Sequence, residues 1–216
     1  MYVAIEGVIG VGKTSLARLL QPSFDSCILL EVFEENPFLS SFYQDRSRYA
    51  FQTQMFFLLS RYHQQRRSVQ DMVSDSKPLL SDYTFDKDAL FARINLAGDE
   101  LEMYYRVHEA LAEKIPAPDL VVYLRAATET LMNRITLRDR SYERAMERDY
   151  IQTLNIAYDE YFLDPNRQRS VMVVDSNDLD FVHRAEDLAL IDNRIRQMLH
   201  LPPFQIELPI SGIPAE

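Results

Sequence analysis

An eight-residue segment near the N-terminus has the residue types of a phosphate-binding loop. Residues 7–14, GVIGVGKT, match the pattern G-x-x-x-x-G-K-[ST], in which glycines allow backbone N–H groups to point at phosphate oxygens. Lys13 would reach the terminal phosphates, and the hydroxyl of Thr14 would bind Mg²⁺. The segment predicts binding of a nucleoside triphosphate through Gly7, Gly10, Val11, Gly12, Lys13, Thr14 and Ser15.

The context of this segment supports the same interpretation. A short apolar, β-branched pattern at 2–6 predicts a buried strand before it, and a helical pattern at 13–21 follows it. The N-terminal end of such a helix is positive and attracts phosphate. A chance match on an ordinary strand–turn–helix is the plain alternative.

Two carboxylates stand where predicted strands end. Asp82 follows the apolar pattern at 79–80, and Glu31 follows the one at 28–30. Ligands in open α/β sheets bind beyond the carboxyl ends of the strands. Asp82 is therefore a candidate Mg²⁺ ligand, and Glu31 a candidate base for the proton of an attacking hydroxyl. The plainer interpretations are a helix-capping Asp82 and a Glu31 that is one surface acid among several.

Polar residues within helical patterns supply further candidates. Gln54 and Arg61 lie among apolar residues of a long helical pattern, and a glutamine can pair with the edge of a base. Such a glutamine more often lies on the wet side of an amphipathic helix. Arg138, Arg140 and Arg144 could bind phosphates in a bidentate manner, or they could form a solvated charged face.

Strands and helices alternate along the chain, which predicts an α/β fold with a parallel sheet covered on both faces. We expect five strands, at 2–6, 28–30, 79–80, 120–124 and 171–174. We expect helices at about 13–21, 48–72, 85–95, 99–114, 128–137, 149–162 and 181–199, with Pro22 ending the first. The pattern is typical of one domain over 1–200, followed by a Pro-rich tail at 201–216.

Composition limits the possible partners and compartment. The chain has 216 residues with 23 Lys and Arg against 33 Asp and Glu, a net charge of −10. Such an acidic surface repels nucleic acid. The lone Cys27 excludes an internal disulfide and fits a reducing compartment. We expect a cytoplasmic protein without a membrane span, because no apolar run approaches the roughly 20 residues required and the first strand pattern begins at Tyr2.

Several segments together resemble the deoxynucleoside kinase family, and the bacterial purine-preferring members most of all. They occur in the family's order and spacing between residues 1 and 182, at 6–14, 31–38, 51–54 with Arg61, 81–88 with Phe91, 123–126, 134–143 and 180–181. The resemblance implies a P-loop kinase fold with an Arg-rich lid. It also implies ATP and Mg²⁺ as cofactors, and phosphorylation of a deoxynucleoside at its 5′-hydroxyl.

The resemblance also implies roles for individual residues. Glu31 resembles the general base, Gln54 the glutamine that pairs with the nucleobase, and Asp88 an acid that helps to sense that base. Tyr43 and Glu143 are similar to the residues that contact the sugar 3′-hydroxyl. The substrate-binding set is then Glu31, Tyr43, Gln54, Arg61, Asp82, Lys87, Asp88 and Glu143.

The donor side follows from the same resemblance. Arg138 and Arg140 are similar to lid arginines that stabilise charge on the transferred phosphoryl group, which makes them catalytic residues together with Glu31 and Lys13. Arg134 and the pair Asp180 and Phe181 resemble the adenine site of ATP. Thr14 and Asp82 resemble the Mg²⁺ ligands.

The chain departs from the family pattern at two places. Val32 follows Glu31 where relatives have proline, and Tyr83 follows Asp82 where relatives have arginine. That arginine normally lies near the 5′-oxygen and the phosphates. Lys87 lies one helical turn beyond Tyr83, so we expect it to replace the missing charge. Tyr83 is the position at which we expect the site to differ from its relatives.

Two alternatives stay open at this stage. A nucleoside monophosphate kinase would bind an acceptor phosphate through arginines and would need no carboxylate base, whereas Glu31 followed by Tyr43 and Gln54 favours a neutral nucleoside. A P-loop subunit that binds nucleotide without turnover is the second. The resemblance to the bacterial purine-preferring members favours deoxyadenosine or deoxyguanosine as substrate, although Gln54 with Asp88 could also serve deoxycytidine. The resemblance suggests a homodimer, or a heterodimer with a paralogous subunit, packed through helices near 40–110.

Overall fold

A five-stranded, all-parallel sheet forms the centre of the protein, as the alternating pattern predicts. The computed structural model describes residues 1–32, 35–75, 77–166 and 169–203, so most of the tail at 201–216 lies outside it. The strand order is β2-β3-β1-β4-β5. The strands are β1 (Tyr2–Glu6), β2 (Cys27–Leu29), β3 (Leu79–Ser81), β4 (Leu120–Arg125) and β5 (Val171–Asp175).

The apolar pattern at 2–6 corresponds to the central strand β1. All five of its residues are buried, because helices cover the sheet on both faces. Ala4 pairs with Ser81 of β3, and Glu6 pairs with Tyr123 of β4. Because the strands are parallel, their carboxyl ends meet at one edge of the sheet, where Glu6, Glu31 and Asp82 follow.

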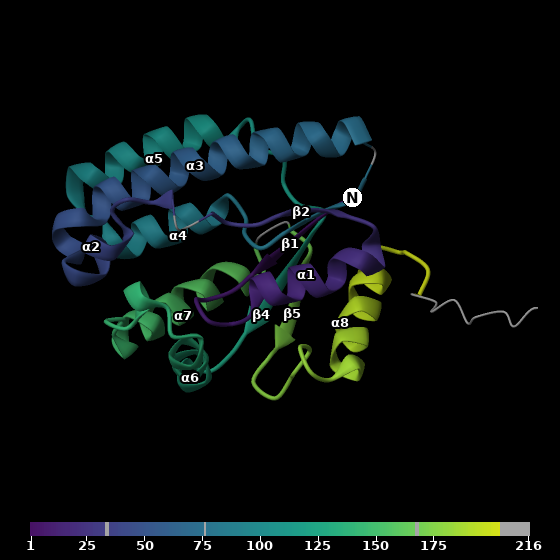
Figure 1. Cartoon of the computed structure of the whole chain (residues 1–216). Helices are drawn as coiled ribbons and strands as arrows, with labels where there is room; N and C mark the ends of the chain where they lie inside the picture. The colour runs from purple at the N-terminus through teal and green to yellow at the C-terminus, as the bar shows by residue number, and fades with distance from the viewer. Residues whose placement is uncertain (33–34, 76, 167–168, 204–216) are drawn as a thin grey trace, which may run out of the picture.

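Helices form a layer on each side of the sheet (Figure 1). On one side α1 (Lys13–Phe24) packs against α8 (Ala185–Met198), and on the other α3 (Arg46–Asp75) runs beside α5 (Gly98–Ala112). The remaining helices surround the carboxyl edge of the sheet: α2 (Leu39–Gln44), α4 (Asp86–Asn95), α6 (Thr128–Arg138), the 3₁₀ turn η2 (Ser141–Glu143) and α7 (Arg148–Phe162). No helix within the described residues is long and apolar enough to span a bilayer.

Two helix boundaries differ from expectation, and one helix is additional. Helix α1 passes through Pro22 and ends at Phe24, whose ring is buried, and Asp25 then takes a left-handed conformation with φ 42°. Proline in the last turn is tolerated because only one backbone hydrogen bond is lost. The final helix starts at Ala185 and not at 181, since the N–H of Arg184 donates to the carbonyl of Asp180 in a separate turn. Helix α2 was not predicted.

Stacked aromatic rings attach α7 to the sheet. Tyr123 of β4 stacks on Tyr158 and on Phe162, with ring centroids 6.3 and 5.1 Å apart. The Tyr123 hydroxyl donates to Asp159 at 2.8 Å. The hydroxyl of Tyr158 is buried without a hydrogen-bond partner among the described residues.

These two tyrosines make a matched pair for unfolding measurements. Tyr123→Phe removes a buried hydrogen bond and should lower the free energy of unfolding by about 1 kcal/mol. Asp159 would keep its bonds to Arg125, so no buried carboxylate is left unpaired. Tyr158→Phe removes an unpaired hydroxyl and should change that free energy by less than about 0.5 kcal/mol or raise it. Urea titration of both variants would contradict this account if Tyr158→Phe were the more destabilising.

Candidate active site

A cleft at the carboxyl edge of the sheet gathers most of the predicted site residues. Helices α2, α3, α4 and α6 and the P-loop surround it. Those predicted residues that line the cleft are Gly10, Lys13, Thr14, Glu31, Tyr43, Gln54, Arg61, Asp82, Lys87, Arg138, Arg140 and Glu143. Residues from six separate stretches of sequence therefore meet in one cavity.

The P-loop has the backbone geometry that its glycines allow. Gly7, Gly10 and Gly12 have φ values of +148°, +88° and +105°, which residues other than glycine rarely adopt. A Cβ atom on Gly7 would lie 2.4 Å from the carbonyl oxygen of Leu124. The loop is framed by β1 and α1, so the strand–turn–helix context that the motif requires is present.

Lys13 lies across the loop that precedes it. Its Nζ donates to the carbonyl oxygens of Gly7 and Val8 at 2.7 and 3.1 Å, which holds the ammonium at the mouth of the loop. Burial and the nearby charge of Lys87 lower the pKa of Lys13 to about 8, while Glu6 and Glu31 act in the opposite direction.

Asp82 joins the P-loop to the end of β2. Its Oδ2 accepts a short hydrogen bond from the Thr14 hydroxyl, and its Oδ1 accepts one from the backbone N–H of Glu31 at 2.8 Å. Asp82 does not cap α4, whose N-cap is Phe85 without a side-chain cap. The plain interpretation of Asp82 as a helix cap is therefore wrong.

Thr14 and Asp82 fit the needs of Mg²⁺. They present a hydroxyl and a carboxylate side by side, and Mg²⁺ in kinases usually takes one or two protein oxygens and completes its shell with phosphates and water. Within the described residues no cluster of three or more His, Cys, Asp or Glu could hold a metal by itself. The donor set matches a metal that arrives with a phosphate ligand.

Glu31 is held by two cations. Arg61 donates to its Oε1 through Nε at 3.1 Å and through Nη2, and Lys87 Nζ lies 2.5 Å from Oε2. Only 14% of the Glu31 side chain is exposed. Burial by itself would raise the pKa of Glu31, but Arg61 and Lys87 outweigh it and hold that pKa well below its usual range. Glu31 is thus no solvated surface acid.

Asp88 lies behind Arg61 and does not line the cleft. It is fully buried and forms an ion pair with Nη1 of Arg61. Its influence on a ligand would pass through the arginine. The four charged groups alternate in sign in the order Asp88, Arg61, Glu31 and Lys87.

Gln54 faces the cleft from α3. Its side chain is 2% exposed, and its Oε1 has no hydrogen-bond partner among the described residues. The interpretation as a solvated glutamine on the wet side of a helix is therefore wrong. A buried amide oxygen without a partner is expensive, and a ligand with an N–H donor would satisfy it.

The end of α6 and the segment after it contribute Arg138, Arg140, Tyr142 and Glu143 to the lining of the cleft. Arg138 donates to both oxygens of Glu143 at 2.6 Å, and Arg140 lies 3.7 Å from the same carboxylate. Tyr142 stacks on Tyr43 of α2 with ring centroids 6.3 Å apart. Arg144 pairs instead with Asp139 on the surface, so the three arginines do not act as one group.

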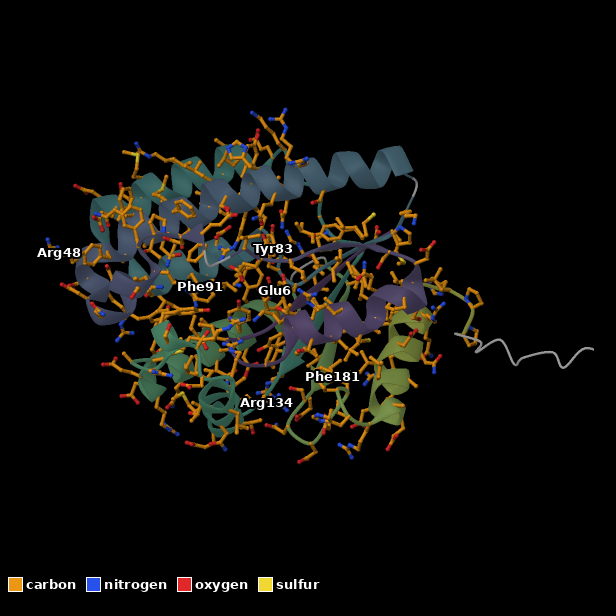
Figure 2. The ribbon with its side chains drawn as sticks, in the orientation of Figure 1. Glu6, Arg48, Tyr83, Phe91, Arg134 and Phe181 are labelled. Atoms are coloured by element: carbon orange, nitrogen blue, oxygen red, sulfur yellow. The ribbon has the colours of Figure 1, made fainter. Side chains whose placement is uncertain are left out.

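Tyr83 lies outside the cleft. Its ring is fully buried in a small cluster with Tyr2, Leu29 and Leu79, and its hydroxyl donates to Gln64 at 2.9 Å. Figure 2 shows Tyr83 on the α3 side of Glu6. Tyr83, at which the chain departs from the family pattern, is therefore a core residue, and Lys87 is one of the two cations that contact Glu31.

The residues predicted for the adenine site lie on α6 and in the loop after β5. Arg134 donates to the carbonyl of Ser176 at 2.6 Å and to that of Val11 at 3.3 Å. The buried Phe181 ring lies against the P-loop, since a Cβ on Gly12 would be 3.0 Å from it. Figure 2 places Arg134 and Phe181 on the opposite side of Glu6 from Tyr83. Asp180 is partly exposed and pairs with His183, and Ser15 is exposed on the first turn of α1.

Some residues of the site were not selected from the sequence. Ile9, Leu39, Phe57, Phe91 and Tyr142 also line the cleft. Phe57 lies one helical turn from Gln54, so helical spacing was a usable signal. The fully buried Glu6, next to Gly7, was detectable as the one acid in an otherwise apolar strand pattern.

Comparisons with known proteins agree with this geometry. The deoxynucleoside kinase family model matches residues 3–200. Deoxyguanosine kinase of Bacillus subtilis (strain 168) is 31% identical over 201 residues, which cover 92% of this chain and 97% of that protein. Deoxyadenosine kinase of Dictyostelium discoideum is 32% identical over 171 residues, or 77% of this chain and 68% of that one. A solved structure of deoxyadenosine kinase from M. mycoides with bound dCTP has a TM-score of 0.78 at 26% identity, covering 91% of this chain and 100% of that chain.

The P-loop geometry predicts the effect of a single methyl group. Gly7→Ala would force a Cβ into the Leu124 carbonyl at a positive φ and should weaken ATP binding roughly tenfold to hundredfold, from about 1–3 kcal/mol of backbone strain. Isothermal titration calorimetry with ATP would measure this. Gly98→Ala is the control, since Gly98 also has a positive φ but no atom within 4 Å of the added Cβ. Equal affinities in the two variants would contradict the proposed loop geometry.

Proposed function

Because the chain belongs to the deoxynucleoside kinase family, we propose that it transfers the γ-phosphoryl group of ATP to the 5′-hydroxyl of a purine deoxynucleoside. The products are a deoxynucleoside 5′-monophosphate and ADP. The observation that carries the proposal is the position of Glu31, an ionised carboxylate in the same cleft as the P-loop Lys13. We propose one kinase domain over 1–200, acting in the cytoplasm.

The donor half comprises the P-loop, Thr14 and Asp82. Loop N–H groups and Lys13 bind the phosphates, and Arg134 with Asp180 and Phe181 binds the adenine. Mg²⁺, held by Thr14 and Asp82, would neutralise charge on the phosphates. The support for this arrangement is the adjacency of Thr14 to Asp82 and of Phe181 to Gly12.

The acceptor half positions a neutral hydroxyl. The 5′-oxygen attacks the γ-phosphorus, the bond from that phosphorus to the bridging oxygen of ADP breaks, and the hydroxyl proton passes to Glu31. The low pKa of Glu31 keeps it ionised but makes it a weak base. A weak base suffices where the transition state is loose, because the hydroxyl becomes acidic only as its bond to phosphorus forms. Orientation of the hydroxyl is then the larger contribution of Glu31.

The remaining cleft residues select and cover the substrate. Gln54 accepts an N–H of the base, and Arg61 borders that subsite while Asp88 fixes the arginine from behind. Tyr43 and Glu143 contact the sugar 3′-hydroxyl. Arg138 and Arg140 act as a lid that stabilises the transferred phosphoryl group and excludes water. For Arg138, that role requires that its ion pair with Glu143 breaks.

The choice of a purine rests on relatives. The proteins named deoxyguanosine and deoxyadenosine kinase align over most of this chain, although a Bacillus subtilis relative at 25% identity is named deoxyadenosine/deoxycytidine kinase. We also propose a dimer through α3 and α5, where Leu59 and Met103 are 43% and 53% exposed. Sedimentation velocity would distinguish that dimer from a monomer.

A panel of substrates tests the proposed reaction. With ATP and Mg²⁺, deoxyadenosine or deoxyguanosine should give the highest kcat/KM among the four natural deoxynucleosides. Glu31→Gln should lower kcat by about 10²- to 10⁴-fold, because the amide neither accepts the proton nor orients the hydroxyl in the same way, with little change in nucleoside affinity. Turnover of monophosphates only would instead indicate a nucleoside monophosphate kinase. ADP release that does not depend on nucleoside would indicate a non-catalytic nucleotide binder.

Lys87 is predicted to supply the charge that relatives obtain from arginine. Lys87→Met removes one of the two cations on Glu31 and should lower kcat by about 10- to 100-fold, or roughly 1.4–2.7 kcal/mol of barrier. Lys87→Arg keeps the charge and should recover part of the rate. Steady-state kinetics at saturating ATP and nucleoside would measure both variants. Full kcat in Lys87→Met would refute the role of this charge.

A further inference from the structure

Glu6 is a buried carboxylate to which the reaction scheme above gives no role. It is the last residue of the central strand, and its side chain is fully buried. Burial raises its pKa, an effect that Lys87, Lys13 and hydrogen bonds from Thr84 oppose. A buried acid in a strand that is otherwise apolar is costly unless its oxygens are fully used.

The two oxygens of Glu6 are used by two different segments. Oε1 accepts hydrogen bonds from the backbone N–H and the hydroxyl of Thr84 at 2.6 and 2.9 Å. Oε2 accepts the backbone N–H of Gly7 at 3.2 Å. One side chain therefore connects the start of the P-loop with the loop between β3 and α4.

These two segments lead to residues of both halves of the proposed site. Gly7 begins the loop that carries Lys13 and Thr14. Thr84 lies between Asp82 and Lys87, the residue that contacts Glu31. The distance between the phosphate donor and the base thus depends on how Gly7 and Thr84 are held together.

We infer that Glu6 is a positioning residue for phosphoryl transfer, which fixes the P-loop relative to the segment that runs from Thr84 to Lys87. The inference rests on the proposed kinase reaction. Transfer between two bound substrates depends on their relative position, and a displacement of 1 Å can lower the rate by about 10²-fold. Only a carboxylate serves this purpose, because glutamine has one acceptor oxygen and would turn an N–H donor toward either Gly7 or Thr84.

Glu6→Gln tests the inference by separating binding from transfer. We expect kcat to fall by about 10²-fold, while the dissociation constants for ATP alone and for the deoxynucleoside alone, measured by calorimetry, stay within about threefold. Tyr123→Phe is the matched control, since Tyr123 pairs with Glu6 across β1 and β4 and also loses a buried hydrogen bond. Its stability should fall while its kcat stays at the wild-type value.

Thr84 provides a second test that does not alter Glu6. Thr84→Val removes the hydroxyl bond to Oε1 and should lower kcat by a smaller factor than Glu6→Gln, whereas Thr84→Ser should restore it. If both residues act through one contact, Glu6→Gln combined with Thr84→Val should be no slower than Glu6→Gln alone. If Glu6→Gln does not fold, the comparison of Thr84→Val with Thr84→Ser decides whether the contact matters for kcat.

Two results would overturn the inference. One is a wild-type kcat in Glu6→Gln, or in Thr84→Val where Glu6→Gln does not fold. The other is a loss of kcat accompanied by an equal loss of ATP affinity, which would make Glu6 a support of the P-loop only. Wild-type protein that phosphorylates no deoxynucleoside would refute the proposed function itself, so the two failures are distinguishable.

Discussion

The burial of Glu31 between two cations is the interaction on which the rest of the site depends. A carboxylate in a cleft loses hydration, and only nearby positive charge makes its ionised form stable there. Arg61 provides that charge but is itself buried, so it needs Asp88 behind it. Removal of one member would leave an uncompensated charge at a cost of about 3–5 kcal/mol. Arg61 belongs to α3 and Lys87 to α4, and both contact Glu31. These ion pairs therefore also hold the two helices in place relative to Glu31.

The same charges determine what kind of chemistry the cleft favours. An acid held by Arg61 and Lys87 stays ionised over the whole physiological pH range, so it accepts hydrogen bonds at all times but removes protons poorly. A reaction that needed a strong base before bond formation would fit this cleft badly. Phosphoryl transfer, in which positioning and charge neutralisation dominate, fits it well. The cleft lining also contains the positive charges of Lys13, Lys87, Arg138 and Arg140.

Local signals account for much of the fold and for the identity of most cleft residues. The strands were predictable because runs such as 171–174 are β-branched and bounded by turns. Helical spacing from Tyr83 predicted a charge at Lys87 within the site, and its Nζ lies 2.5 Å from Oε2 of Glu31. Tyr83 was expected to change the site relative to the family, but its ring packs in the core with Leu79 of the same segment, a contact that the sequence pattern did not indicate. Helix α2 and the pairing of Arg138 with Glu143 depend on tertiary packing and left no periodic signal.

The register of the sheet is what brings the three acids together. Ser81 lies opposite both Ala4 of β1 and Leu29 of β2, so Glu6 and Glu31 each follow their paired residue by two positions, and Asp82 follows Ser81 by one. Backbone pairing, and not side-chain flexibility, therefore sets the spacing of the acids. A slip of one residue in β3 would send its side chains to the opposite faces of the sheet. Asp82 would then lose Thr14 and the Glu31 N–H together, and Thr84 would leave Glu6. The donor and acceptor halves are thus joined by strand pairing first and by side-chain contacts second.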